Sequence, residues 1–319
     1  MSNKRNHYIP RFYLTGFVDP RNKPYIWLYE KDNLDIRKST AGNIAVRKKY
    51  YSFLAPEGGQ DSEIFEDVLA KIEGRAAPVF RVIGQRQSLS DQERIILAIF
   101  LAFIMVRVPN YRENVERATA DFMKRMNEIL ASNPEGFKSM IEKFQEDTGN
   151  RIGMPVEELR EFFLGDDYSV KVDSQFSLDI MPLMAEKLSL ILYRMDWLFG
   201  EATDKHKFLT CDNPVFYCDP KRSSRSLSGT GLFNEDVEVT FPVSRDIVFI
   251  GTWKKASSYR KLDNSLVKEI NRRTVVSALR FVFSSQYSEG IHRLVQKHQD
   301  SAPTMRVNRI GPYIIGRME

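Results

Sequence analysis

The chain of 319 residues is 42% hydrophobic and 28% charged, a balance that is typical of a globular protein and excludes a disordered one. Its longest uncharged apolar run, residues 95–106, is shorter than the roughly 18 residues that a bilayer span needs, so we expect a buried helix and no membrane partner. The first residues lack the apolar stretch of a signal peptide, and two cysteines cannot form a disulfide framework, which together predict a cytoplasmic protein.

The net charge of +5 is unevenly distributed along the chain. Residues 1–60 hold 11 Lys and Arg against 5 Asp and Glu, and residues 251–319 hold 13 against 5, whereas the residues between them are acidic. Two basic ends indicate contact with a polyanion such as nucleic acid. The alternative, which the sequence does not exclude, is that the basic ends pack against the acidic middle.

The first sixty residues are predicted to be mainly β. Residues 24–40 alternate apolar and polar side chains around a polar centre at Asp32 and Asn33, which is typical of a β-hairpin. A short helical turn is expected after Thr40, followed by a strand over residues 50–53. Because a two-stranded hairpin is marginal by itself, we expect the hairpin to join or cover strands from the carboxy-terminal region and to bring the first residues near them.

From residue 61 to residue 196 the apolar positions recur three and four apart, which predicts helices. Ser90 and Glu93 form the pattern of a capping box directly before the apolar run, and Pro109 should end that helix near Val108. Further helices are predicted over residues 111–130, 136–147, 156–165 and 174–195.

Short β-like runs return from Trp197 onward, with a helix predicted over residues 263–280 and a loop over residues 220–236. The fold class is therefore predicted to be α+β. The β-rich amino-terminal and carboxy-terminal segments should form one mixed or antiparallel sheet, with a large central helical region. We expect a single domain over residues 1–319, made of a hairpin segment (1–60), a helical region (61–196) and a β-rich segment that completes the sheet (197–319).

Several segments, taken in chain order, resemble one known family. They are "HYIPRFYLTGF" at 7–17, "MVRVPNYRE" at 105–113, "FLTCDNPV" at 208–215, "VTFPVS" at 239–244 and "INRRTVVSALRFVFSS" at 270–285. With them the chain resembles the domain of unknown function 4238 (DUF4238) family, although Cys211 stands where a serine is usual. The resemblance implies positions rather than a reaction. These positions are His7, Tyr8, Pro10, Glu73, Arg107, Asp212, Asn213 and Asn271.

His7 is the first candidate for chemistry, because the ordinary pKa of histidine lies nearest neutrality, as a general base or a metal ligand requires. The alternative is a buried histidine that bonds to the backbone and anchors the amino terminus. Asp212 and Asn213 follow an expected strand and precede Pro214, a pattern typical of a turn stabilised by local hydrogen bonds. On a rigid turn, the same carboxylate and amide could also hold a metal ion or orient a histidine.

Glu73 and Arg107 lie on neighbouring predicted helices, where they are expected to form a structural ion pair. The alternative is that Arg107 binds a phosphate through two hydrogen bonds. Lys48 and Lys49, beside two tyrosines, are expected to contact phosphate while the rings stack on bases, unless they are simply solvated. Tyr8, Asn213 and Asn271 complete the predicted substrate-binding set. The sequence contains no zinc motif, no phosphate-binding glycine loop and no nucleophile elbow.

These residues predict a nuclease or a related phosphodiester hydrolase that acts on nucleic acid. His7 would activate water, Asp212 with Glu73 would hold a divalent metal ion (Mg or Mn), and Arg107 would bind phosphate. The scattered distribution of the resembled family suggests phage defence. The alternative prediction is a non-catalytic nucleic-acid-binding or regulatory module.

Overall fold

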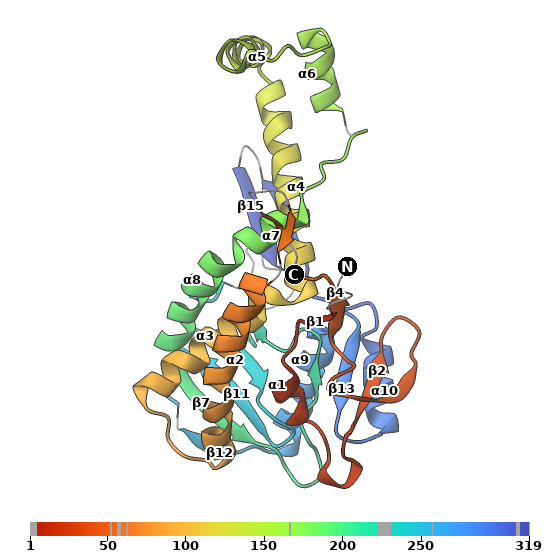
Figure 1. Cartoon of the computed structure of the whole chain (residues 1–319), viewed down its shortest axis with the longest axis vertical. Helices are drawn as coiled ribbons and strands as arrows, with labels where there is room; N and C mark the ends of the chain where they lie inside the picture. The colour runs from red at the N-terminus through yellow and green to blue at the C-terminus, as the bar shows by residue number, and fades with distance from the viewer. Residues whose placement is uncertain are drawn as a thin grey trace. The chain divides into compact units, whose positions relative to one another are not determined.

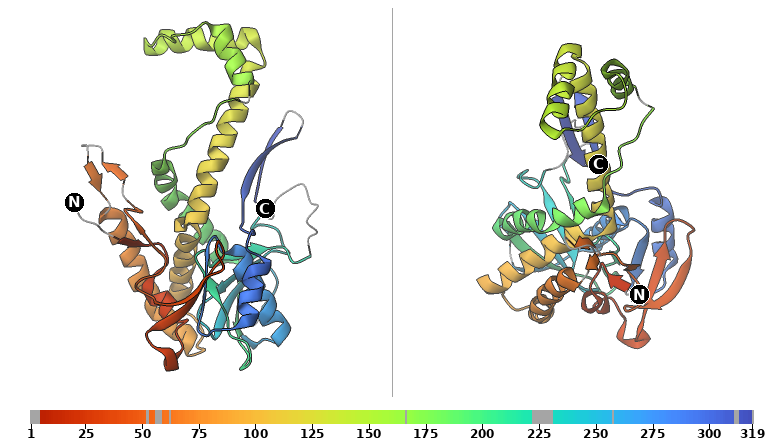
Figure 2. Two further views of the ribbon diagram at one scale, coloured as in Figure 1. Left: turned by 90° about the vertical axis from the view of Figure 1, so that its right-hand side faces the viewer. Right: turned by 45° about the horizontal axis from the view of Figure 1, so that its top comes forward.

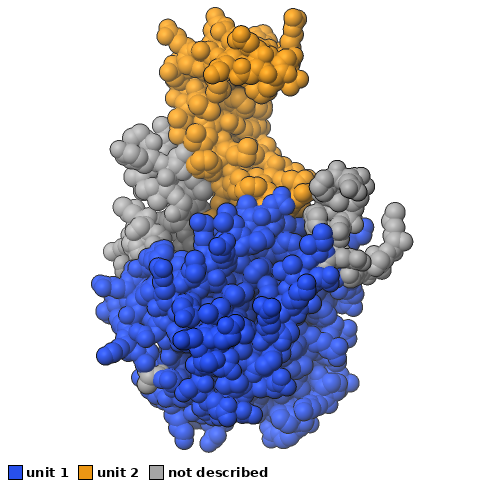
Figure 3. Space-filling view, turned by 60° about the vertical axis from the view of Figure 1, so that its left-hand side comes forward, with its two compact units in different colours: residues 1–112, 177–303 blue, residues 113–176, 304–319 orange. Residues whose placement is uncertain are grey.

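A computed structural model of the chain describes residues 5–318 apart from residues 52, 56–58, 62, 166, 222–230, 257 and 311–312. The chain divides into two compact units (Figure 3). Unit 1 comprises Met1–Arg112 and Ser177–Pro303, and unit 2 comprises Glu113–Phe176 and Thr304–Glu319. The single domain over residues 1–319 stays a prediction.

Unit 1 combines helices with two larger β-sheets, which confirms the α+β class. The five-stranded sheet has the order β12-β7-β11-β10-β9, and its neighbouring strands are antiparallel except for the parallel pair β12 and β7. Its strands are β7 (Asp196–Glu201), β9 (Phe216–Cys218), β10 (Glu238–Pro242), β11 (Ile247–Thr252) and β12 (Tyr259–Lys261).

The four-stranded sheet, of order β3-β2-β13-β8, joins the two ends of the chain's β structure. The predicted hairpin is formed by β2 (Tyr25–Glu30) and β3 (Ile36–Thr40), and β2 runs antiparallel to β13 (Phe281–Ser284). In the right-hand view of Figure 2 the red-orange hairpin lies beside the blue carboxy-terminal part of unit 1. On its other side β13 pairs with the short strand β8 (Thr210–Cys211). The hairpin therefore joins a carboxy-terminal strand, as predicted.

The β structure is divided between sheets where one continuous sheet was expected, and one division falls at the predicted turn. β8 belongs to the four-stranded sheet, whereas β9, which follows directly after the turn, belongs to the five-stranded sheet. Pro214 has no N–H to donate to a ladder, and the N–H of Asp212 bonds to the carbonyl of Phe281, 3.0 Å away. The chain therefore passes from one sheet to the other at Asp212–Pro214.

Three helices pack against the five-stranded sheet: α2 (Glu63–Gly84), α3 (Asp91–Arg107) and α8 (Met181–Arg194) (Figure 1). Both bonds of the predicted capping box are present at Ser90 and Glu93, and α3 ends at Arg107, before Pro109, as expected. Most of α3 is buried in the core. Taken singly, no helix in the described ranges is long and apolar enough to cross a bilayer; α3 passes such a test only together with the next helix, α4 (Pro109–Ala131).

Two local predictions need correction. The helix expected over residues 174–195 is broken into α7 (Ser174–Asp179) and α8, because Pro182 near the start of α8 cannot donate to the preceding turn. The strand expected over 50–53 is replaced by β4 (Val46–Lys48), a turn in which Lys49 has a φ of 51°, and β5 (Phe53–Ala55). The loop predicted over 220–236 falls mostly on residues 222–230, outside the described residues.

Six further elements complete the description of unit 1, and of these α9 contributes buried side chains to the core. They are β1 (Arg5–His7), α1 (Arg11–Thr15), η1 (Pro20–Asn22), β6 (Gly59–Asp61), α9 (Asn264–Ser277) and α10 (Glu289–Lys297). β1 pairs with β4, and β5 pairs with β6, as separate two-stranded ribbons.

Unit 2 contains most of α4, together with α5 (Pro134–Thr148), α6 (Val156–Leu164) and the hairpin β14 (Met305–Ile310) and β15 (Tyr313–Met318). The side chain of Asn133 caps α5, and Gly149 ends it with a φ of 69°, a value that glycine adopts without strain. Phe137 and Ile141 form a small core with Ala131. The helices predicted over 136–147 and 156–165 are thus confirmed.

Candidate functional site

The first described residues are tied into unit 1. β1 forms an antiparallel ribbon with β4, and the Tyr8 N–H donates to the carbonyl of Ala45, 3.0 Å away. The Tyr8 carbonyl accepts from Nε of Arg107 at 2.7 Å. These two bonds, one to the N–H and one to the carbonyl of the same residue, hold the amino-terminal motif in place.

Arg107 is the buried anchor of this segment, with a side chain that is only 1% exposed. One of its terminal nitrogens donates to Glu73 at 2.8 Å, and the other, Nη2, is buried without a hydrogen-bond partner among the described residues. A phosphate cannot reach a guanidinium that is covered in this way. The geometry therefore supports the structural ion pair between Glu73 and Arg107, rather than the phosphate clamp.

His7 is half-buried at the end of β1, and its Nε2 lies 3.2 Å from the carbonyl oxygen of Gly42. Because a carbonyl can only accept, this contact places the imidazole proton on Nε2 and leaves Nδ1 as an acceptor. Burial lowers the pKa of His7, and this effect outweighs the opposing influences of the Gly42 carbonyl and the Glu73 carboxylate. The imidazole is therefore neutral near pH 7, the form that a general base needs.

The ribbon around His7 is strongly basic. Arg5 lies directly opposite Lys48, and His7 lies opposite Val46, so that Arg5, His7 and Lys48 share one face. Arg5, Lys48 and the neighbouring Arg47 and Lys49 are all exposed. We call β1, β4 and Lys49 the basic ribbon. Like charges directly opposite each other on paired strands repel, and an anion bound between Arg5 and Lys48 would remove that cost.

The tyrosines beside the basic ribbon face the interior, which contradicts the expectation that they stack on bases. The Tyr51 ring is 1% exposed, and its hydroxyl lies 3.3 Å from the carbonyl of His7. The Tyr50 hydroxyl donates to the carbonyl of Arg107 at 2.8 Å, while the guanidinium of Arg112 lies 4.6 Å from its ring. Both rings brace the amino-terminal motif instead.

Asp212 is also buried and committed to the fold. Its carboxylate accepts the backbone N–H groups of Leu279, Arg280 and Phe281 at 2.8–3.0 Å, where α9 gives way to β13. Burial raises the pKa of Asp212 to about 6, against the opposing effects of these three bonds and of Lys31. The local turn that the sequence predicted is thus present, and the carboxylate holds a second connection in place.

The two predicted asparagines also bond within unit 1. The amide of Asn213 donates to the carbonyl of Ser277 at 3.0 Å and approaches Oδ1 of Asn110 at 3.4 Å. Asn271 accepts from the N–H of Leu209 and donates to the carbonyl of Lys207, each at 2.9 Å. Asn213 joins the Asp212 turn to α9, and Asn271 joins α9 to the segment that leads into this turn. The amide nitrogen of Asn213 and both polar atoms of Asn271 are therefore engaged within the fold.

The structure brings the predicted residues together in two groups that meet at Tyr8. His7, Glu73 and Arg107 form one group; Asp212 and Asn213 belong to the other. Burial raises the pKa of the Tyr8 hydroxyl, and the nearby Asp212 carboxylate adds to this effect. Among the described residues, the His7 imidazole and the Asp212 carboxylate make no contact. Consecutive side chains of an extended segment point to opposite sides, so Tyr8 faces Asp212 and His7 faces outward.

Within the described part of the chain, no group of three His, Cys, Asp or Glu side chains is placed to hold a metal ion. The carboxylate of Glu73 bonds to Arg107, and that of Asp212 bonds to backbone, so the two predicted ligands do not form a joint site. The divalent metal stays a prediction.

Sequence reasoning missed Lys31, which is only 1% exposed at the end of β2. Its ammonium group donates to the carbonyls of Val275, Ala278 and Ser301, and burial lowers its pKa. It lies close enough to Cys211 and Asp212 for both to oppose that shift. The only sequence signal is a lysine at the end of an apolar strand, which is too common a pattern to single it out.

Fold and site together define an α+β protein with an exposed basic ribbon. Next to the ribbon lies the buried Asp212 turn, which links the four-stranded sheet to the five-stranded sheet. The family model described as "Protein of unknown function (DUF4238)" matches residues 5–288, and the chain belongs to this family. Neither the curated proteins nor the solved structures contain a match to the chain.

Proposed function

We propose that this protein is a phosphodiester hydrolase that binds nucleic acid at the basic ribbon. One observation carries the proposal: the Nδ1 acceptor of a neutral His7 lies on the same ribbon face as the exposed cations Arg5 and Lys48. A base beside two cations is the minimum that attack on a phosphodiester requires, because a proton must leave the nucleophile while negative charge builds on the phosphate.

In the proposed reaction, Nδ1 of His7 takes the proton from a water molecule whose oxygen attacks phosphorus. The bond from phosphorus to the leaving oxygen breaks, and that oxygen takes a proton from solvent. Arg5 and Lys48 stabilise the charge on the phosphate oxygens. The Gly42 carbonyl holds the imidazole in the required tautomer throughout.

The predicted Mg²⁺ or Mn²⁺ would stabilise the same phosphate charge, and its importance is measurable directly. Cleavage of a fluorescent single-stranded 30-mer, as RNA and as DNA, is followed with EDTA and then with each metal added. If added metal restores cleavage after EDTA, the result supports the predicted divalent ion. If cleavage is unchanged in EDTA, Arg5 and Lys48 alone stabilise the charge on the phosphate.

The variant His7→Ala tests the base. We expect cleavage to fall by about a hundredfold or more, with binding and melting temperature nearly unchanged. Lys48→Gln should weaken the binding of the oligonucleotide. The matched control is Lys187→Gln, which removes an exposed charge from α8 and should change neither binding nor cleavage. Cleavage that survives in His7→Ala contradicts the assignment of the base.

The alternative function, a non-catalytic nucleic-acid-binding module, also has a specific observation in its favour. Asp212 and Glu73, the carboxylates predicted to be catalytic, each bond to groups of the fold. A binding module predicts salt-sensitive affinity for the same oligonucleotides with no turnover under any metal condition. Absence of both binding and cleavage would overturn the two proposals together.

A further inference from the structure

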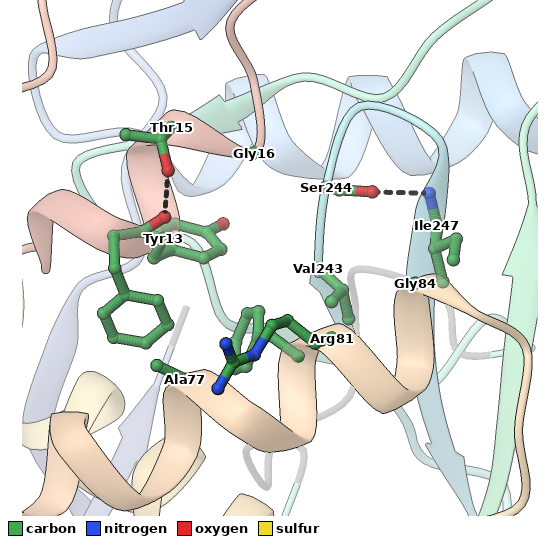
Figure 4. A pocket seen from close by; sticks show the side chains of 11 residues that line it. Tyr13, Thr15, Gly16, Ala77, Arg81, Gly84, Val243, Ser244 and Ile247 are labelled. Atoms are coloured by element: carbon green, nitrogen blue, oxygen red, sulfur yellow. Dashed lines mark hydrogen bonds between the residues drawn. The ribbon is translucent and has the colours of Figure 1, made fainter.

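Unit 1 contains an open cavity of about 420 Å³ that none of the foregoing functions uses. It lies between α1, α2 and the turn that joins β10 to β11 (Figure 4). Its volume falls in the range of small-molecule sites. Two of the segments that resemble the family line it, since Phe12, Tyr13, Thr15 and Gly16 come from the amino-terminal motif, and Val243 and Ser244 come from "VTFPVS".

The floor of the cavity is aromatic and rigid. The rings of Phe12 and Phe80 meet edge to face at 5.3 Å, and the Tyr13 ring stacks on Phe241 at 4.9 Å. The Tyr13 hydroxyl bonds to Thr210 at 2.6 Å and to the carbonyl of Pro242 at 2.8 Å, so it is occupied inside the protein. A ligand in the cavity therefore meets ring surfaces, which suit a flat apolar body.

Arg81 supplies the charge at the rim. Its side chain is exposed and runs back along α2 toward Ala77 (Figure 4). It has no hydrogen-bond or ion-pair partner among the described residues. By contrast, the hydroxyl of Thr15 donates to the carbonyl of Phe12 at 2.5 Å, and that of Ser244 accepts from the N–H of Ile247 at 3.2 Å. The guanidinium is thus the uncommitted charged group of the lining.

The charge of the ligand follows from these surroundings. A guanidinium binds a carboxylate through two parallel hydrogen bonds. The cavity meets α2 at Gly84, where the helix ends, and a helix carries partial negative charge at its carboxy terminus. That end disfavours anions in general, and a doubly charged phosphate more strongly than a carboxylate with a single charge.

We propose that this cavity binds a small molecule with a flat, ring-sized apolar body and one carboxylate. The body covers Phe12 and Phe80, and the carboxylate pairs with Arg81. This inference is independent of the proposed hydrolase, because none of the residues that line the cavity belongs to the basic ribbon.

The test uses the full chain and two probes of equal size in isothermal titration calorimetry: naphthalene-2-carboxylate and the neutral 2-naphthalenemethanol. We expect the carboxylate to bind more tightly than the alcohol. Arg81→Gln should weaken the binding of naphthalene-2-carboxylate by about tenfold and leave the affinity for the alcohol unchanged. Arg75→Gln, which removes an exposed charge from the same helix outside the cavity, is the control and should have no effect.

A second variant tests the cavity itself. Ala77→Phe fills it from the α2 side, and both probes should lose affinity while the melting temperature stays near that of the parent. If this variant unfolds, the comparison of the two probes on Arg81→Gln still decides the question. No binding of either probe at 1 mM, or equal affinity for both in the parent, overturns the proposal. His7→Ala should leave probe binding intact, which separates this outcome from failure of the hydrolase.

Discussion

The basic ribbon and the Asp212 turn both contain residues that the family resemblance marked, yet they stand in opposite physical situations. The cations of the ribbon are exposed and face each other across two strands, so they gain from a bound anion. Asp212 is buried, and its carboxylate oxygens accept three backbone N–H groups. A polar residue in a motif can thus serve a ligand or the fold, and burial with hydrogen-bond saturation separates the two roles.

The largest expected effect comes from Asp212→Ala. It leaves three backbone N–H groups without their acceptor and removes a negative charge from the neighbourhood of the buried Lys31, so we expect a loss of about 3–5 kcal/mol in the free energy of unfolding. Urea denaturation followed by tryptophan fluorescence measures it, since Trp27, Trp197 and Trp253 all lie in unit 1. The exposed Asp204→Ala serves as control. If the free energy of unfolding falls by less than about 1 kcal/mol while cleavage is abolished, Asp212 is catalytic, and it does not differ from the ribbon residues in role.

Arg107→Met should have the next largest effect. It removes the charged hydrogen bonds to the Tyr8 carbonyl and to Glu73, which we expect to cost about 2–3 kcal/mol of stability. Hydrogen exchange at the Tyr8 amide should become faster, because the strand β1 loses its anchor. Arg75→Met, on the exposed side of α2, should leave exchange unchanged. Unaltered exchange at Tyr8 in Arg107→Met would show that Arg107 does not hold the amino-terminal motif.

Lys48→Gln tests the ribbon and should act on binding rather than on stability. Loss of one phosphate contact should weaken nucleic-acid affinity several-fold at low salt and reduce the salt slope by about 1. Stability should stay the same or rise slightly, because the repulsion with Arg5 disappears. Fluorescence anisotropy at several salt concentrations measures the slope. A destabilised protein with an unchanged slope would place Lys48 with the structural residues.

The smallest effect concerns the pH dependence of stability through His7. Burial lowers the pKa of the folded imidazole below its ordinary 6.5, so near that pH the unfolded chain binds more protons than the folded one. His7 therefore contributes a loss of stability as pH falls below 6.5, complete once the folded pKa is passed. The variant His7→Gln should show a shallower decline in urea denaturation between pH 7 and pH 5. An identical decline would mean that the imidazole is as solvated as in the unfolded chain.

Several features of the fold follow from short-range signals. Ser90 and Glu93 predict the start of α3, Pro109 predicts its end, and the alternation over residues 24–40 predicts the hairpin, because each depends on groups a few residues apart. The sequence also places His7 and Lys48 among the site residues. It could not show that they share a face, since that depends on the pairing of β1 with β4 across some forty residues.

The sequence alone therefore determined the fold class and the helix boundaries set by caps and prolines, and it named candidate site residues. Tertiary structure alone decided which of those residues face solvent: it turned Tyr8 toward Asp212 and left His7 outward, buried Lys31 and placed Arg81 beside an aromatic cavity. The reason is physical. Capping and alternation are settled within one turn or strand, whereas burial depends on contacts between segments as far as 270 residues apart in the chain, which no local pattern encodes.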